Sequence, residues 1–265
     1  MGRGRLVRMA EFKHEDLSGS TFEELSLAET RFHDVTLRNA VFDWVDMRGV
    51  QIKGAWFQDV TINADIGNVV INGVDVVPLI EAELDRRHPG REKMRPVDPQ
   101  GYREAWDLLE RLWEGTVERA RGFTEEQLHQ RVNGEWSFIE TQRHLVFATD
   151  AWIRRALLGD PAPWSPLDLP HDEMDEQPSV PRDRDVRPSL DEVLALRRDR
   201  QATMREVLAV LTEDRLAEMT EPVLEPGYPA SESFPVTRCL SCIISEEFEH
   251  RLFAERDLDT LAAGA

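Results

Sequence analysis

A strict five-residue repeat runs through the N-terminal part of this chain. Large apolar residues occupy every fifth position without a slip: Phe12, Leu17, Phe22, Leu27, Phe32, Leu37, Phe42, Met47, Ile52, Phe57 and Ile62. Two positions before each of these centres the residue is small or apolar, with the exception of Glu15. A period of five fits neither an α-helix nor a β-strand, so the pattern predicts a solenoid. The rest of the chain lacks the repeat, which indicates two different domains in series.

Several of these stretches have a small residue two positions before a central Phe, as in AEFKH, STFEE, ETRFH, NAVFD and GAWFQ, and in the first three the residue between them is polar. They resemble the pentapeptide-repeat family. The resemblance implies a right-handed, quadrilateral β-helix with four quintets per coil, which we expect over residues 9–77. Stacked central side chains would fill its interior. The bulky Leu25, Val35 and Val45 in the small column depart from the family pattern, so less regular coils are expected.

Two functions are open for the solenoid. One is a rigid scaffold or docking face for a partner protein, because a fold alone does not fix a function. The other follows from long acidic pentapeptide proteins that look like a DNA duplex and capture DNA-binding enzymes. Acidic residues outnumber basic ones between residues 9 and 76, which gives this region the net negative charge that a mimic of DNA needs. The array is short for a duplex mimic.

Composition limits the partners of the whole chain. The 265 residues include 32 Lys and Arg against 51 Asp and Glu, a formal net charge of −19. Such a surface repels phosphate backbones and anionic lipids, so neither nucleic acid nor membrane is an expected partner. No secretory signal or membrane-spanning run is recognisable. The only cysteines, Cys239 and Cys242, are expected to be core residues, and we expect a cytoplasmic protein.

The remaining sequence has helical punctuation. Residues 78–97 read as a helical linker, and residues 98–262 as a four-helix bundle with one start signal for each long helix. These signals are Asp98 with Pro99, the capping boxes Ser137 with Glu140 and Ser189 with Glu192, and Pro235. The crossover at residues 160–187 is long and rich in proline, so it is a candidate lid over the bundle.

Hydrophilic residues interrupt the apolar stripes of two predicted helices. In the last helix the stripe contains Glu246 and His250, one turn apart, and in the second helix His144 lies on an inward face. Buried groups of this kind need compensation. One solution is a divalent metal held by three protein ligands with an open position, as catalytic sites have. Glu247 is an alternative carboxylate ligand, and a hydrogen-bonded cluster without metal is the alternative to a metal site.

The runs GEWSFIETQRHLVFATDAW and SEEFEHRLFAERDL resemble the DinB-like superfamily of four-helix bundles, of the DinB/YfiT type. This superfamily includes metal-dependent thiol S-transferases that use mycothiol or bacillithiol. Its members commonly bind the metal through one His of the second helix and a His-x-x-x-His pair of the last, which fall here on His144, Glu246 and His250. Glu246 in place of His is a departure from that pattern.

The resemblance implies a divalent metal, zinc or nickel above all, a small thiol such as mycothiol or bacillithiol, an electrophilic small molecule and a homodimer. It leaves two functions for the whole chain. The first is a thiol S-transferase. The second is a non-enzymatic protein in which the solenoid docks a partner and the bundle is a scaffold.

Overall fold

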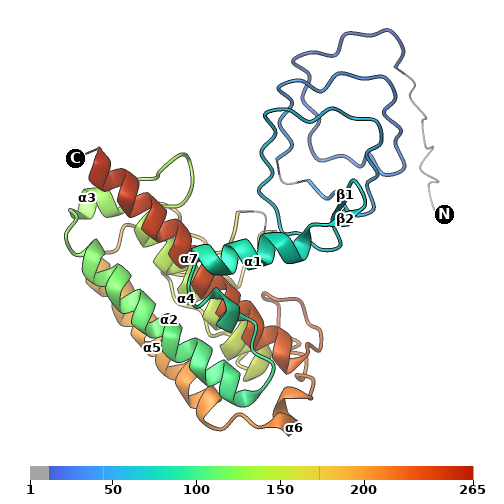
Figure 1. Ribbon diagram of the computed structural model, residues 1–265. Coiled ribbons are helices and arrows are strands. Elements are labelled where there is room, and N and C mark those ends of the chain that lie inside the picture. Colours follow the sequence, from blue (N-terminus) through green and yellow to red (C-terminus); the bar gives the residue numbers. More distant parts are fainter. Residues whose placement is uncertain (1–11, 44, 173, 265) are drawn as a thin grey trace, which may run out of the picture. The chain divides into compact units, whose positions relative to one another are not determined.

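The computed structural model describes residues 12–43, 45–172 and 174–264. The chain divides into two compact units, and the boundary lies between Asn63 and Ala64 (Figure 1). This boundary comes earlier than residue 77, where the sequence places the end of the repeats. We describe the two units separately below.

In the first unit the backbone turns a corner in every described quintet. A residue with positive φ, between 50° and 77°, recurs every five positions at His14, Gly19, Glu24, Glu29, Asp34, Asn39, Gly49, Gly54 and Asp59. At alternate corners a turn is closed by a backbone hydrogen bond, such as the one that Ser20 N donates to Leu17 O at 3.1 Å. Positive φ at the third residue of such a turn is typical of type II. The five-residue period of the sequence is therefore a period of the backbone.

The predicted interior of this unit is wrong in the structure. The central side chains from Phe12 to Ile62 remain between 43% and 71% exposed, and residues 12–43 and 45–63 contain no β-strand. The backbone hydrogen bonds of these residues are local turn bonds and join no two coils. Side chains stack and strands pair only when neighbouring chains lie about 4.8 Å apart. The coils are open here, so the apolar column is exposed to solvent.

The second unit opens with a short hairpin. Strands β1 (Val70–Ile71) and β2 (Val74–Asp75) pair antiparallel, with Val70 opposite Asp75. The two turn residues, Asn72 and Gly73, have φ values of 51° and 83°, the left-handed conformation that a two-residue type I′ turn requires. Helix α1 (Val77–Arg87) and the 3₁₀ helix η1 (Arg91–Met94) follow.

Four long helical segments form a bundle (Figure 1). They are α2 (Pro99–Ala120), α4 (Phe138–Thr149) with its continuation η2 (Asp150–Leu157), α5 (Leu190–Ala209) and α7 (Val236–Ala263), with the short α3 (Glu125–Leu128) and α6 (Glu213–Leu216) in the connections. Helices α2 and α4 each pack against both α5 and α7. The predicted helical bundle is therefore confirmed.

The predicted helix starts are also present. The Ser137 hydroxyl accepts from Glu140 N while the Glu140 carboxylate accepts from Ser137 N, and Ser189 with Glu192 does the same. One detail differs from the sequence expectation. The second helix changes from α to π geometry at Asp150, and π segments are often found at functional sites.

The bundle core is apolar and tightly closed. Its centre includes Trp106 and Leu109 from α2, Met204 from α5, and Leu240 and Ile243 from α7, all at most 2% exposed. No described helix is long and apolar enough to cross a membrane.

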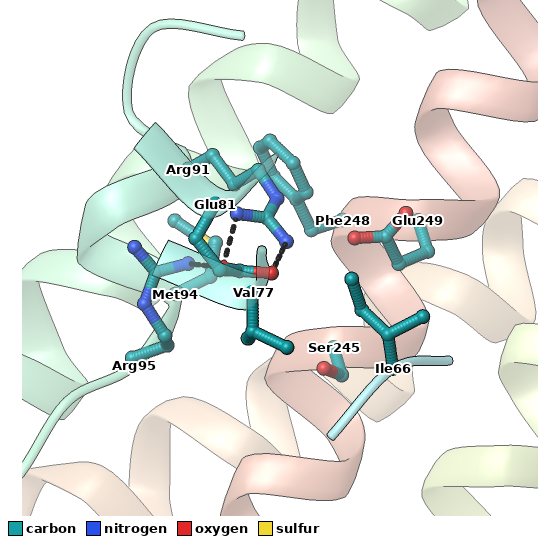
Figure 2. Close-up of a pocket in the computed structure, with 9 residues that line it drawn as sticks. All are labelled: Ile66, Val77, Glu81, Arg91, Met94, Arg95, Ser245, Phe248 and Glu249. Atoms are coloured by element: carbon teal, nitrogen blue, oxygen red, sulfur yellow. Dashed lines mark hydrogen bonds and ion pairs between the residues drawn. The ribbon is translucent and has the colours of Figure 1, made fainter. Parts of the chain in front are cut away.

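A pocket of about 450 Å³ lies where α1 and η1 meet α7. Figure 2 shows Arg91 in this pocket with its guanidinium directed at the Glu81 carboxylate. Both Arg91 and Arg95 bond Glu81 and Asp85, at 2.5–3.0 Å for the closest contacts. These ion pairs neutralise the positive charge of the pocket wall and hold α1 against η1.

Candidate metal centre

The structure brings together the three side chains that the sequence predicts as ligands. His144 comes from α4, and Glu246 and His250 come from α7, one helical turn apart. One ligand atom from each residue lies within 4.8 Å of the other two. Glu246 Oε2 lies 3.2 Å from His144 Nε2 and 3.0 Å from His250 Nε2. The carboxylate oxygen therefore lies between two imidazole nitrogens.

The orientation of His144 is set from its other side. Its Nδ1 atom lies 3.0 Å from the carbonyl oxygen of Leu169, in the long crossover between η2 and α5. A carbonyl only accepts, so Nδ1 carries the proton and Nε2 of the neutral ring presents a lone pair to Glu246. Burial lowers the pKa of His144, which favours the neutral ring. The ring is thus pre-oriented as a ligand.

Glu246 is an ionised carboxylate at this site. Burial raises the pKa of Glu246, but its close contacts with the imidazoles of His144 and His250 outweigh that effect and hold the pKa well below its usual range. An ionised oxygen facing the lone pair of neutral His144 is repulsive unless a proton or a cation lies between them. A proton or a cation at the point where the three groups converge would therefore stabilise this arrangement.

The donor set fits a divalent metal. In a tetrahedral zinc site with bonds of about 2.0–2.2 Å, ligand atoms lie roughly 3.3–3.6 Å apart, close to the 3.0 and 3.2 Å observed around Glu246. Imidazole with carboxylate suits zinc, nickel, iron or manganese. Three protein ligands leave a position open, and the side chains of Glu246 and His250 are 32% and 19% exposed. An external ligand can reach such a site from solvent.

The second carboxylate that the sequence left open has another role. Glu247 is buried, and its two carboxylate oxygens accept from Arg197 at 2.6 and 2.5 Å. Its backbone carbonyl accepts from the Trp113 indole. Adjacent residues of a helix point about 100° apart, which carries Glu247 away from His144. Glu246 is the carboxylate that meets the two histidines.

The predicted stripe of α7 runs from the core to the surface. Val236, Cys239 and Ile243 are at most 1% exposed, whereas Phe253 at the other end is 44% exposed. Glu246 lies between these extremes. His144 is buried, whereas Glu246 and His250 are partly exposed, so the histidine and carboxylate cluster lies at the rim of the bundle.

Aromatic rings surround the imidazoles, and sequence reasoning missed this. The ring of Trp136, the residue before the Ser137 cap, lies 4.5 Å from that of His144 and is stacked 5.8 Å from that of His250. Phe147 lies 6.0 Å from His144. The one sequence signal for this role was the position of Trp136 directly before the helix that carries His144.

Tyr228, in the loop between α6 and α7, is another residue that the sequence did not single out. Its ring lies 5.7 Å from Phe147 and 5.5 Å from His171. Burial raises the pKa of Tyr228, and the negative charge of Glu246 adds to this effect. The loop thus brings a neutral phenol to the side of the centre. His171 of the crossover contacts this ring.

The two cysteines are free thiols. Burial raises the pKa of Cys239 to about 11 and that of Cys242 to about 12, the latter with a contribution from Glu246. Both therefore stay protonated near neutral pH, and a thiol in that state is a poor nucleophile. Cys239 is buried, as expected of a core residue, whereas Cys242 is only partly buried.

A helical bundle with an inward-facing His, Glu and His set at its rim is typical of a metal-binding bundle. A family model described as DinB superfamily matches residues 108–254, and a model of pentapeptide repeats matches residues 16–61 in eight copies. The chain belongs to the DinB superfamily and carries pentapeptide repeats at its N-terminus. Neither the curated proteins nor the solved structures gave a significant match.

Proposed function

We propose that the helical unit binds one divalent cation through His144, Glu246 and His250 and acts as a metal-dependent thiol S-transferase. Zinc or nickel is the expected metal, and a low-molecular-weight thiol such as mycothiol or bacillithiol is the expected co-substrate. The observation that carries this proposal is the ionised oxygen of Glu246, which lies 3.2 and 3.0 Å from two imidazole nitrogens.

When bound, the metal would supply a Lewis acid that holds the sulfur of a small thiol as thiolate. The chain's own residues prepare the place for it. Leu169 fixes the tautomer of His144, and Glu246 adds a full negative charge. Packing of Trp136 on both imidazoles limits their rotation. The exposed side of the cluster would admit the thiol and an electrophilic substrate. The thiol gives up its proton, a sulfur–carbon bond forms, and the carbon–halogen bond of a halide substrate breaks with release of the halide ion.

Metal analysis of the purified protein tests the first part of this proposal. We expect about one zinc or nickel per chain, and loss of that metal in His250→Ala. His129→Ala is the matched control, because His129 is in the same unit but bonds the carbonyl of Pro188. Protein that takes up no metal when zinc and nickel are offered would rule the proposal out.

Thiol transfer is then assayed on the metal-loaded protein. Mycothiol or bacillithiol is offered with an electrophilic aromatic halide, and loss of free thiol is followed. We expect turnover with wild type and with His129→Ala, and none with His250→Ala. Metal binding without turnover of either thiol would leave a metal-binding bundle without the transferase activity.

A second candidate function is protein docking by the pentapeptide unit. The exposed central column and the fully exposed Trp56 favour it, since such apolar exposure is typical of interaction surfaces. The bundle would then be a scaffold within a homodimer of the kind that the family resemblance implies. Light scattering of the full chain and co-purification with Trp56→Ser test this function. An unchanged mass and unchanged partners in the variant would argue against it.

A further inference from the structure

Two carboxyl groups are buried together behind the candidate metal centre. Asp150 of η2 and Asp168 of the crossover are both 0% exposed. The two oxygens of Asp150 accept from Arg200 at 3.0 and 2.6 Å. Asp168 Oδ2 accepts from Ser165 N at 3.1 Å. The carboxyl groups of Asp150 and Asp168 are also within hydrogen-bond reach of each other.

The remaining oxygen of Asp168 shows where a proton lies. Asp168 Oδ1 is buried and receives no hydrogen bond from any residue that the structure describes. An ionised carboxylate would leave this oxygen uncompensated, next to a second carboxylate. Burial raises the pKa of Asp168 well above its usual range, and the charge of Asp150 adds to this effect. Two carboxyl groups at one site share one proton. Burial raises the pKa of Asp150 as well, to about 6, but the hydrogen bonds and charge of Arg200 and the bond from Asp168 oppose this effect, so near neutral pH Asp150 is the ionised partner.

Asp168 lies between two residues whose carbonyls are held by α4. The carbonyl of Leu167 accepts from Arg143 Nε at 2.8 Å, and the carbonyl of Leu169 accepts from His144 Nδ1 at 3.0 Å. A bond from Asp168 to η2 therefore fastens the middle of a three-residue segment. The last of these residues sets the ring orientation of His144.

We propose that Asp168 is a positioning residue: it remains a carboxylic acid, donates its proton to Asp150, and so fixes the Leu169 carbonyl that orients His144. The purpose of this arrangement rests on the proposed metal-binding function. The protonation itself does not, because it follows from contacts made without any metal.

The other charged groups around the pair do not take this proton. Arg154 of η2 lies 3.6 Å from Asp150 Oδ1, and Arg143 of α4 and Arg200 of α5 are also near; arginine stays protonated throughout the neutral range. Asp199 of α5 is bonded by Arg154 and Arg200. Burial raises the pKa of Asp199, but these arginines outweigh that effect and lower it.

The protonation is tested on the metal-free full-length protein with Asp168→Asn. The amide keeps the shape of the acid and an N–H donor toward Asp150, but it does not titrate. Asp175→Asn, an exposed change in the same crossover, is the control. Urea unfolding is followed by the circular dichroism of the helices between about pH 5 and pH 8.

A folded state that holds a proton which the unfolded state has released loses stability as the pH rises. We expect the folding constant of wild type to fall by up to about tenfold per pH unit relative to Asp168→Asn, and to run parallel to that of Asp175→Asn. The infrared band of a protonated carboxyl should be present in wild type and weaker in Asp168→Asn. A wild-type to Asp168→Asn difference that is independent of pH, or the absence of such a band, overturns the proposal.

The positioning role is tested with Asp168→Ala, which removes the bond to Asp150. In metal-free protein, ¹⁵N NMR of the imidazoles should show one tautomer of His144 in wild type and in Asp168→Asn, and a mixture in Asp168→Ala. Zinc affinity should fall roughly 10–100-fold in Asp168→Ala, as for loss of a group that supports a ligand, and stay near wild type in Asp168→Asn. An unchanged tautomer in a folded Asp168→Ala overturns the role.

The two proposals fail separately. If wild type binds no zinc, the proposed function fails, while the pH dependence and the tautomer still decide the state and role of Asp168. If wild type binds zinc but the difference in stability between wild type and Asp168→Asn does not depend on pH, only the inference about Asp168 fails. Should Asp168→Ala not fold, the comparison of wild type with Asp168→Asn still tests the protonation.

Discussion

The Nε2 atom of His144 lies 3.2 Å from the Oε2 atom of Glu246, although 102 positions separate the two residues in the chain. The same oxygen lies 3.0 Å from His250 Nε2, and the other nitrogen of His144 is committed to Leu169. A neutral imidazole thus directs its lone pair at an ionised carboxylate. The contact is favourable only with a positive charge between the partners, and the predictions about Glu246 and zinc below follow from that requirement.

Replacing Glu246 by glutamine should weaken metal binding, whereas the same change at its neighbour Glu247 should lower stability. In Glu246→Gln the amide is a weak metal ligand, so metal affinity should fall by more than the roughly 10–100-fold that loss of a supporting group costs. In Glu247→Gln metal binding should persist, but Arg197 loses its buried partner, which typically costs about 3–5 kcal/mol. Zinc titration and urea unfolding of both variants measure the two effects.

The pair of variants also contains its own control, since each changes one carboxylate to an amide on the same helix. A folded Glu247→Gln that binds no zinc would show that the ligand set is wrongly assigned. Unchanged stability in that variant would show that the Arg197 pair contributes little to the fold.

Acid should destabilise the metal-free bundle through His144. Burial lowers the pKa of His144 in the folded state, so on acidification the unfolded chain takes up its proton first. Stability should therefore fall as pH decreases from about 6.5, by up to about 1.4 kcal/mol per pH unit from this one residue. His144→Asn should have a shallower slope in urea unfolding between about pH 7 and pH 5.

His129 contributes in the same direction, because burial lowers its pKa as well. Some acid sensitivity should thus remain in His144→Asn. His33→Asn, in the pentapeptide unit, is the control and should keep the wild-type slope. An identical slope in His144→Asn and wild type would mean that the buried ring does not titrate as argued.

Zinc should stabilise the helical unit by mass action. A ligand at 100 times its dissociation constant raises the free energy of unfolding by about 2.7 kcal/mol when it binds only the folded state. The helical signal should report this increase in wild type, and His250→Ala should show none. An equal gain in both proteins would place the zinc elsewhere.

Local signals made the bundle predictable. Ser137 with Glu140 and Ser189 with Glu192 each close a capping box within four residues, so the sequence alone contains both partners. The convergence of the candidate ligands was predictable for a similar reason: Glu246 and His250 interrupt an apolar stripe at the spacing of one turn, and His144 lies on an inward face. The change from α to π geometry at Asp150 has no comparable local signal, because it occurs where Asp150 bonds Arg200 of another helix.

The support of the site could not be read in the same way. Leu169 contacts His144 through its backbone carbonyl, which every residue type has. Asp168 acts through Asp150, which lies on another element. The type of neither residue therefore predicts its role. In the pentapeptide unit the local pattern could be predicted from the sequence, but the packing of the coils could not. The five-residue period of the sequence recurs in the backbone, with positive φ at Gly19 and Gly49, but it did not determine whether neighbouring coils close over the central side chains.

Trp136 should report metal binding by fluorescence. Its ring is stacked on His250 and lies 4.5 Å from His144, so a paramagnetic ion such as nickel bound there should quench it. Nickel titration of wild type should lower the emission, and Trp136→Phe should lose most of that response while still binding the ion. Trp113→Phe, which replaces a core tryptophan beside Arg197, is the matched control and should keep it. Equal quenching in wild type and Trp136→Phe would contradict the stacked arrangement.

Arg143 should hold the long crossover in place. Its guanidinium donates to the carbonyls of Leu167, Asp183 and Val186, at 2.8, 2.5 and 3.4 Å. Arg143→Ala leaves these acceptors without their charged donor, and we expect a loss of about 2–4 kcal/mol in the free energy of unfolding. The exposed Arg198→Ala on α5 should cost less than about 0.5 kcal/mol.

The same change should weaken zinc binding, because the Leu169 carbonyl that orients His144 belongs to the segment that Arg143 holds. We expect faster proteolytic cleavage within residues 159–188 and a roughly 10-fold or greater fall in zinc affinity in Arg143→Ala. Arg198→Ala should match wild type in both assays. Faster cleavage with unchanged zinc affinity would show that His144 keeps its orientation without the crossover, and that its ring is fixed by Trp136 and Phe147 instead.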